Sequence, residues 1–177
     1  NNPGWGYEEL LPYFRKLEDR PESDHNDRGV GGPIKISSGN YQDKLSNAFF
    51  QACVDVGAKS NEDYNINFDG VGWLQYSIKN GLRSSTSSGH LKTAKKNKNL
   101  KIITKAEVEK IIFDGKKAIG VKYNKDNYSK EVRVRGEVIL SAGSINSPKI
   151  LELSGIGQGS LLKSYGLDVI SDLPGVG

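Results

Sequence analysis

The chain contains 177 residues, a length that corresponds to roughly one domain or slightly more. Hydrophobic residues make up 36% of it and charged residues 26%, which is typical of a globular chain and unlike disordered, collagen-like or membrane proteins. The 25 Lys and Arg against 21 Asp and Glu leave a net charge of +4. So mild a charge does not by itself indicate a nucleic-acid-binding protein.

The cysteine content and the first residues of the sequence limit the kinds of protein and of site that are possible. Cys53 is the single cysteine, so neither an internal disulfide nor a multi-cysteine zinc site is possible, and no metal site is expected. The sequence holds no Met and opens at Asn1 without a targeting segment, which favours a piece of a longer protein. We expect a cytoplasmic location, with membrane association of the full-length protein as the alternative.

Three helices are predicted in the first hundred residues. Apolar residues at helical spacing predict one helix over residues 7–18 and another over residues 45–56, where Gly57 would end it. The Ser and Thr cluster at residues 84–88 predicts the cap of a third helix. The polar, glycine-rich segments between them are predicted to be irregular.

After Asn99 the sequence changes to short runs rich in Val, Ile and Tyr, which are typical of strands. The pair Asp114-Gly115 is a strong hairpin signal. We therefore predict a strand meander and a mixed α/β (α+β) fold class. The predicted strands cover residues 100–104, 108–113, 118–123, 131–135 and 138–140.

The last predicted strand leads through the small residues Ala142, Gly143 and Ser144 toward a helix. That helix is predicted over residues 147–153, with Ser147 as its cap. Small residues let another group approach the backbone closely, and the free N–H groups of a helix start favour an anionic or polar ligand. A tight turn that only packs the helix on the sheet explains the same residues.

Four stretches, in chain order, resemble the glucose-methanol-choline (GMC) family of flavin-dependent oxidoreductases, nearest to its choline dehydrogenase-like branch. They are GWGYEELLPYF at residues 4–14, NGLRSS at 80–85, GSINSPKILELSGIG at 143–157 and DLPGVG at 172–177. The resemblance implies an FAD enzyme that oxidises the CH–OH group of choline or another small primary alcohol by hydride transfer to the flavin.

The same resemblance implies how the chain is divided. Residues 1–99 would belong to the substrate-binding domain and residues 100–177 to the FAD-binding domain. The family's glycine-rich dinucleotide fingerprint lies earlier, and its catalytic His, with a second His or Asn, lies beyond Gly177. No catalytic residue is therefore expected within this chain, and the electron acceptor is left open.

Two places resemble flavin contacts of the family. Val108 resembles the strand residue whose backbone N–H and C=O meet the adenine ring. Ala142, Gly143 and Ser144 resemble the loop that runs beside the cofactor, where small side chains avoid a clash. An inward-facing strand valine is compatible with the same role, because its side chain packs while its peptide edge binds.

Other candidates are weighed against ordinary structural roles. Neither His25 nor His90 matches a catalytic position, so both are predicted to be surface residues. Cys53 is predicted to be a small core residue rather than a nucleophile. No G-x-S-x-G sequence surrounds any serine, which argues against a hydrolase.

A basic run supplies the alternative function. It consists of Lys92, Lys95, Lys96, Lys98 and Lys101, with no acidic residue among them. A non-catalytic binding or structural module could use this run on anionic partners. Because the run lacks interleaved aromatic residues, a solvated helix face is favoured and no nucleic-acid partner is expected.

Overall fold

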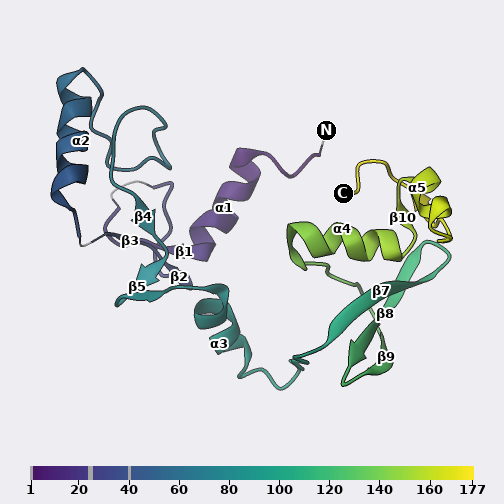
Figure 1. The fold of residues 1–177 in the computed structure, drawn as a ribbon. Helices are drawn as coiled ribbons and strands as arrows, with labels where there is room; N and C mark the ends of the chain where they lie inside the picture. The colour runs from purple at the N-terminus through teal and green to yellow at the C-terminus, as the bar shows by residue number, and fades with distance from the viewer. Residues whose placement is uncertain (1, 24–25, 40) are drawn as a thin grey trace. The chain divides into compact units, whose positions relative to one another are not determined.

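A computed structural model describes residues 2–23, 26–39 and 41–177 (Figure 1). They form two compact units, Asn1–Lys101 and Ile102–Gly177. The predicted surface histidine His25 lies outside the described residues. None of the helices among the described residues has both the length and the apolar character needed to span a membrane.

The first unit holds helices joined by long irregular segments and very short strands. Strand β1 pairs with β2 in parallel, whereas β3 with β4 and β5 with β6 form antiparallel pairs. The helices are α1 (Tyr7–Leu17), α2 (Lys44–Asp55), the π-helix η1 (Ser87–Leu91) and α3 (Lys92–Ala94). The strands are β1 (Glu18–Asp19), β2 (Ile34–Lys35), β3 (Ser37–Ser38), β4 (Gln75–Tyr76), β5 (Ile78–Lys79) and β6 (Leu82–Arg83).

Helix α1 confirms the first predicted helix to within one residue. The Glu9 carboxylate reaches back to the N–H of Gly6, at 2.6 Å, and satisfies a donor that the helix leaves free. Acidic Glu8 and Glu9 occupy its first turn, and basic Arg15 and Lys16 its last turn, where each complements the helix dipole.

Helix α2 confirms the second prediction and shows how its start and end are fixed. The Asp43 carboxylate accepts hydrogen bonds from the N–H groups of Leu45 and Ser46. The hydrogen bond from the Ser46 hydroxyl, together with these backbone bonds, lowers the pKa of Asp43. Gly57, with φ of 98°, follows the helix in the left-handed region, and Cys53 is half-buried on the helix.

The predicted Ser and Thr cap is also present. The hydroxyl of Ser85 accepts from the N–H of Ser88 at 3.2 Å, and the Ser88 hydroxyl accepts from the N–H of Ser85 at 2.9 Å. These reciprocal bonds start η1, which continues directly into α3. The polar cluster therefore opens a helix, as its composition predicts.

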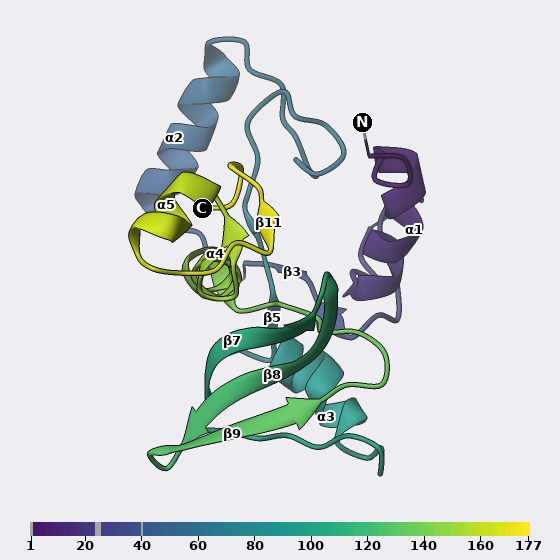
Figure 2. The same ribbon diagram turned by 90° about the vertical axis from the view of Figure 1, so that its right-hand side faces the viewer.

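The second unit is a three-stranded antiparallel sheet with helices beside it (Figure 2). The strands, in the order in which they pair, are β7 (Glu107–Asp114), β8 (Lys117–Lys125) and β9 (Tyr128–Arg133). They are followed by α4 (Gly143–Leu153), β10 (Ile156–Gly157), α5 (Gly159–Ser164) and β11 (Ser171–Asp172). Ile111, Ile150 and Leu162 are its buried apolar residues, and they come from β7, α4 and α5.

Two predicted strands, 100–104 and 138–140, were wrong. Neither segment pairs with another strand among the described residues. A strand forms only where a neighbouring strand accepts its backbone hydrogen bonds, and the Val and Ile content of a segment does not supply one. The predicted hairpin is confirmed, with Gly115 in the left-handed region at φ of 57°.

The predicted start of the last long helix was also wrong. Helix α4 begins at Gly143, four residues before the predicted cap Ser147. The Ser147 hydroxyl still supports the helix start, since it accepts from the N–H of Ala142 at 3.0 Å. Pro148 is tolerated inside the helix because it removes only the bond to the carbonyl of Ser144. Gly155, with φ of 86°, follows the end of the helix in the left-handed region.

Ser154 joins α4 to the sheet through one buried hydroxyl. Its Oγ accepts from the N–H of Ile111 at 2.8 Å and donates to the carbonyl of Ile150 at 2.5 Å. We expect Ser154→Ala to lower the free energy of unfolding by about 1–3 kcal/mol, because the buried N–H of Ile111 loses its acceptor. Urea unfolding measures the change.

Ser164→Ala is the matched control for that experiment. The Ser164 hydroxyl is exposed and donates only to the carbonyl of Leu161 within α5. Its loss is expected to change the free energy of unfolding by no more than about 0.5 kcal/mol. Equal effects of the two substitutions would contradict the role given to Ser154.

Candidate functional site

The start of α4 carries three of the four predicted site residues. Ala142, Gly143 and Ser144 are exposed, and α4 packs against β7 in the second unit (Figure 1). The first N–H groups of a helix lack partners within the helix and carry its partial positive charge. This helix start can therefore bind an anionic or polar group.

Gly143 keeps this helix start open. Its φ of 88° lies in the left-handed region, and a Cβ added there would meet no atom within 4 Å. A glycine is therefore favoured at this position by the backbone conformation, and not by crowding from other parts of the chain. The free space next to it is what a group approaching the backbone needs.

Val108, the fourth predicted residue, lies half-buried near the beginning of β7. It pairs with Tyr123 of β8, and the register shifts between Val108 and Lys110, as in a β-bulge. Within the described residues β7 is an edge strand of its sheet. An edge strand can present backbone N–H and C=O groups to another molecule. Val108 and the start of α4 thus belong to one unit, on a strand and a helix that pack together.

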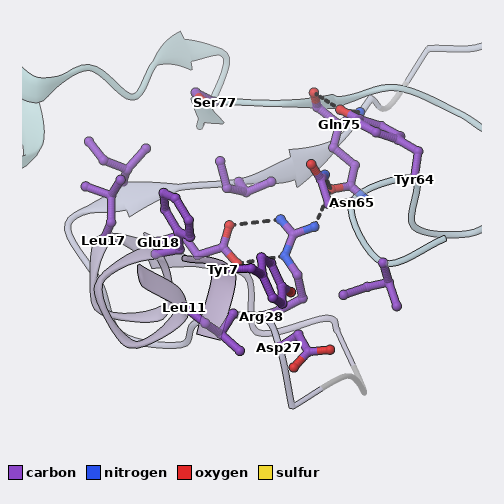
Figure 3. Close-up of a pocket in the computed structure, with 14 residues that line it drawn as sticks. Tyr7, Leu11, Leu17, Glu18, Asp27, Arg28, Tyr64, Asn65, Gln75 and Ser77 are labelled. Carbon is purple, nitrogen blue, oxygen red and sulfur yellow. Dashed lines mark hydrogen bonds and ion pairs between the residues drawn. The ribbon is translucent and has the colours of Figure 1, made fainter. Parts of the chain in front are cut away.

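A second cluster, in the first unit, has no counterpart among the predicted residues. The guanidinium of Arg28 bonds both carboxylate oxygens of Glu18, with Nε at 2.7 Å and Nη2 at 2.9 Å (Figure 3). Its Nη1 lies 2.8 Å from both carboxylate oxygens of Asp63 and 3.0 Å from the Gln75 side chain. The Nε of Arg20 lies 3.8 Å from Asp63. We call these five residues the Arg28 network.

Burial and pairing act in opposite directions on the charges of the Arg28 network. Arg28 is 8% exposed and Asp63 is 4% exposed. Burial by itself would lower the pKa of Arg28, but its bonds and charge contact with Glu18, followed by Asp63, raise it. Burial would raise the pKa of Asp63, but the Asn65 N–H and the Arg28 charge lower it. Both groups are therefore ionised at neutral pH.

A cavity of about 530 Å³ lies beside the Arg28 network (Figure 3). Helix α1 supplies Tyr7, Leu11, Phe14 and Leu17 to its wall, and Glu18 and Arg28 reach it from the network. An apolar wall with a few fixed polar groups is a common form of small-molecule pocket. No local sequence signal could have found it, because its walls come from segments far apart in the chain.

The remaining candidates are distributed over the surface. His90 is exposed, as predicted. Among the residues that the structure describes, no three His, Cys, Asp or Glu side chains are grouped as metal ligands would be. All five lysines of the basic run are exposed, namely Lys92, Lys95, Lys96, Lys98 and Lys101.

The comparison with protein families decides the relationship of this chain. The family described as GMC oxidoreductase matches residues 1–177. The chain belongs to the GMC oxidoreductase family. The four stretches that suggested this family all lie within the match, and so do Val108 and the start of α4.

Individual GMC relatives cover nearly all of the chain. The oxygen-dependent choline dehydrogenase of Brucella anthropi is 41% identical over 98% of this chain and 32% of its own length. The mitochondrial choline dehydrogenase of Homo sapiens is 39% identical over 98% of this chain and 30% of its own length. The chain thus spans about a third of the length of these relatives.

A solved GMC structure has the same fold. The FAD-dependent oxidoreductase from Chaetomium thermophilum is 37% identical, with a TM-score of 0.90, over 100% of this chain and 33% of that protein. The mixed α/β fold predicted from the sequence is therefore confirmed.

Proposed function

We propose that this chain is one part of an FAD-dependent oxidoreductase that acts on the CH–OH group of a small primary alcohol, choline or a similar one. The observation that carries the proposal is the identity of 41% and 39% to two choline dehydrogenases over 98% of the chain. Similarity over nearly every residue is stronger support than any of the short motifs taken alone.

The second unit would hold part of the cofactor. The N–H groups of Gly143 and Ser144 at the start of α4 suit a polar or anionic part of FAD, whereas the N–H of the neighbouring Ala142 already donates to the Ser147 hydroxyl. The backbone of Val108 on the edge strand β7 suits the hydrogen-bonding edge of the adenine ring. The open space at Gly143 fits a bulky group against the backbone. When bound, FAD supplies the acceptor for the hydride.

We keep the assignment of the two domains that was predicted from the sequence. Residues 1–99 would contribute to the substrate-binding domain and residues 100–177 to the FAD-binding domain. The groups that remove the hydroxyl proton would lie outside these 177 residues.

Reductive titration of the enzyme that contains this chain tests the proposed function. Choline added without oxygen is expected to bleach the visible absorbance of bound flavin in a single step. Glycine betaine keeps the trimethylammonium group but has no alcohol, so it should leave the flavin oxidised. The proposal fails if neither choline nor any other small primary alcohol reduces the flavin.

Gly143→Ala tests the role of the helix start. A side chain in the left-handed region costs roughly 1–2 kcal/mol, and the Cβ would also occupy the open space beside the backbone. We expect weaker retention of FAD by the enzyme during gel filtration. Gly136→Ala is the control, because Gly136 also has open space but lies outside the left-handed region. Equal flavin loss in both variants would contradict the assignment.

The exposed basic run leaves a binding module as the alternative. If the chain acts through Lys92, Lys95, Lys96 and Lys98, it should bind heparin tightly and with a steep salt dependence. Replacement of these four lysines by Gln should then abolish the binding. We expect weak heparin binding that changes little on this replacement, as for a solvated helix face. Tight binding lost in the Gln variant would favour the module.

A further inference from the structure

The turn between β5 and β6 contains the one Asn-Gly pair of the sequence, Asn80-Gly81. Both residues are exposed and both lie in the left-handed region, with φ of 51° and 74°. A Cβ added at Gly81 would meet no atom within 4 Å, so no neighbouring group crowds Gly81 on that side. The side-chain amide of Asn80 and the main chain after it are therefore open to water.

The hairpin that carries this turn is held by few contacts. Strands β5 and β6 share only two residue pairs, Ile78 with Arg83 and Lys79 with Leu82. Ile78 is 37% exposed and Leu82 is 74% exposed, so little apolar surface is buried by the pairing. A short, exposed hairpin of this kind opens locally at small cost, which frees the backbone at Asn80 to rotate.

We propose that Asn80 is a site of spontaneous deamidation. The backbone nitrogen of Gly81 attacks Cγ of Asn80, the new C–N bond closes a succinimide ring, and the bond from Cγ to Nδ2 breaks. Ammonia leaves with the proton from Gly81 N. Water then opens the ring at either carbonyl and gives an aspartyl or an isoaspartyl residue. Glycine allows the attack because it has no side chain to obstruct the approach of its nitrogen.

The reaction alters both charge and backbone length next to a buried anchor. A carboxylate replaces an amide beside Lys79, and the isoaspartyl product adds a methylene to the main chain. Ser84 lies three residues after Gly81 and is 7% exposed. Its hydroxyl accepts from the N–H of Lys35 at 2.8 Å, and its own N–H donates to the carbonyl of Ser77 at 2.8 Å. Deamidation would therefore change the main chain close to the hydrogen bond by which Ser84, after β6, holds Lys35 of β2.

Asn127 provides an internal comparison. It also lies in an exposed two-residue turn, between β8 and β9, with φ of 63°. The residue after it is Tyr128, whose side chain crowds the attacking nitrogen, and six residue pairs hold the hairpin. A barrier higher by roughly 1.4 kcal/mol at Asn127 would make Asn80 react about tenfold faster.

The test is incubation of the purified chain in mildly alkaline water labelled with heavy oxygen, followed by peptide mapping. Label should accumulate at position 80 about tenfold faster than at position 127. Asn80→Gly keeps a residue suited to the turn and should remove the labelled product. Tyr128→Gly should raise the rate at Asn127. Equal rates at Asn80 and Asn127, or an Asn127 unaffected by Tyr128→Gly, would overturn the proposal.

Discussion

Asp63→Asn is expected to lower the free energy of unfolding of the first unit by about 3–5 kcal/mol. The substitution removes the negative charge that lies 2.8 Å from Arg28 and 3.8 Å from Arg20. The side chains of Arg28 and Arg20 are nearly inaccessible to water, at 6% and 9% exposure. Arg28 would then keep only the carboxylate of Glu18, and the buried guanidinium of Arg20 would lose its ion pair with Asp63. Chemical denaturation followed by circular dichroism measures the loss.

Asp69→Asn is the matched control for that measurement. Asp69 lies in the same segment of the first unit but is exposed, so the same chemical change removes no buried charge. We expect an effect within about 0.5 kcal/mol. If Asp63→Asn and Asp69→Asn cost the same, the Arg28 network does not hold this unit together.

The same residue predicts how stability depends on pH. The pKa of Asp63 is lowered in the folded state, because the Asn65 N–H and the charge of Arg28 outweigh the effect of burial. Its contribution is therefore fully present above the unfolded pKa of about 3.9 and is lost as the pH falls through the lower folded value. The Asp63→Asn variant should show a flatter dependence of stability on pH in this acidic range.

Local signals predicted the helices well. Helices α1 and α2 begin and end within one residue of their predicted limits, because the apolar spacing in both helices and the glycine after α2 are local features of the sequence. The error at α4 has the same origin. Ser147 and Pro148 have the composition of a helix start, but the helix begins four residues earlier, at Gly143, whose φ lies in the left-handed region.

The unpaired segments at 100–104 and 138–140 show where local signals end. Their composition is typical of strands, and Ile139 is 84% exposed in the described structure. Whether a strand forms depends on a partner that the segment itself does not encode. The hairpin of β7 and β8 was predictable because the two-residue turn at Asp114-Gly115 is a local signal. The third strand was predicted over residues 131–135 but covers Tyr128–Arg133, so its limits were wrong by two to three residues.

The Arg28 network was not predictable for a similar reason. Arg28 bonds Glu18 ten residues earlier and Asp63 35 residues later. Charged residues in a polar loop read as solvent-exposed until the fold brings them together. Gly29 was the one local signal, because a Cβ there would clash with the carbonyl of Arg15. In a glycine-rich loop, however, the sequence does not show which contact requires a particular glycine.

The isolated 177-residue chain is expected to be catalytically inert and to bind FAD weakly or not at all. Its proposed cofactor contacts are limited to the backbone of Val108 and the residues around Gly143. Recognition of the FAD diphosphate depends on a glycine-rich turn before a helix, and the sequence contains no G-x-G-x-x-G. Flavin absorbance after gel filtration, followed by addition of choline, measures both expectations.

Exposed apolar residues should affect the same preparation. Ile139 is 84% exposed, Leu45 79% and Phe68 94%, so the isolated chain should associate at high concentration. Light scattering on the gel-filtration column separates this association from failure to bind flavin, because a monomeric fraction can be titrated with FAD alone. A yellow, stoichiometric complex in that fraction, bleached by choline, would place the complete site within these 177 residues. The proposed location of the catalytic groups outside the chain would then be wrong. A monomer that stays colourless with FAD and shows no reaction with choline would agree with that location.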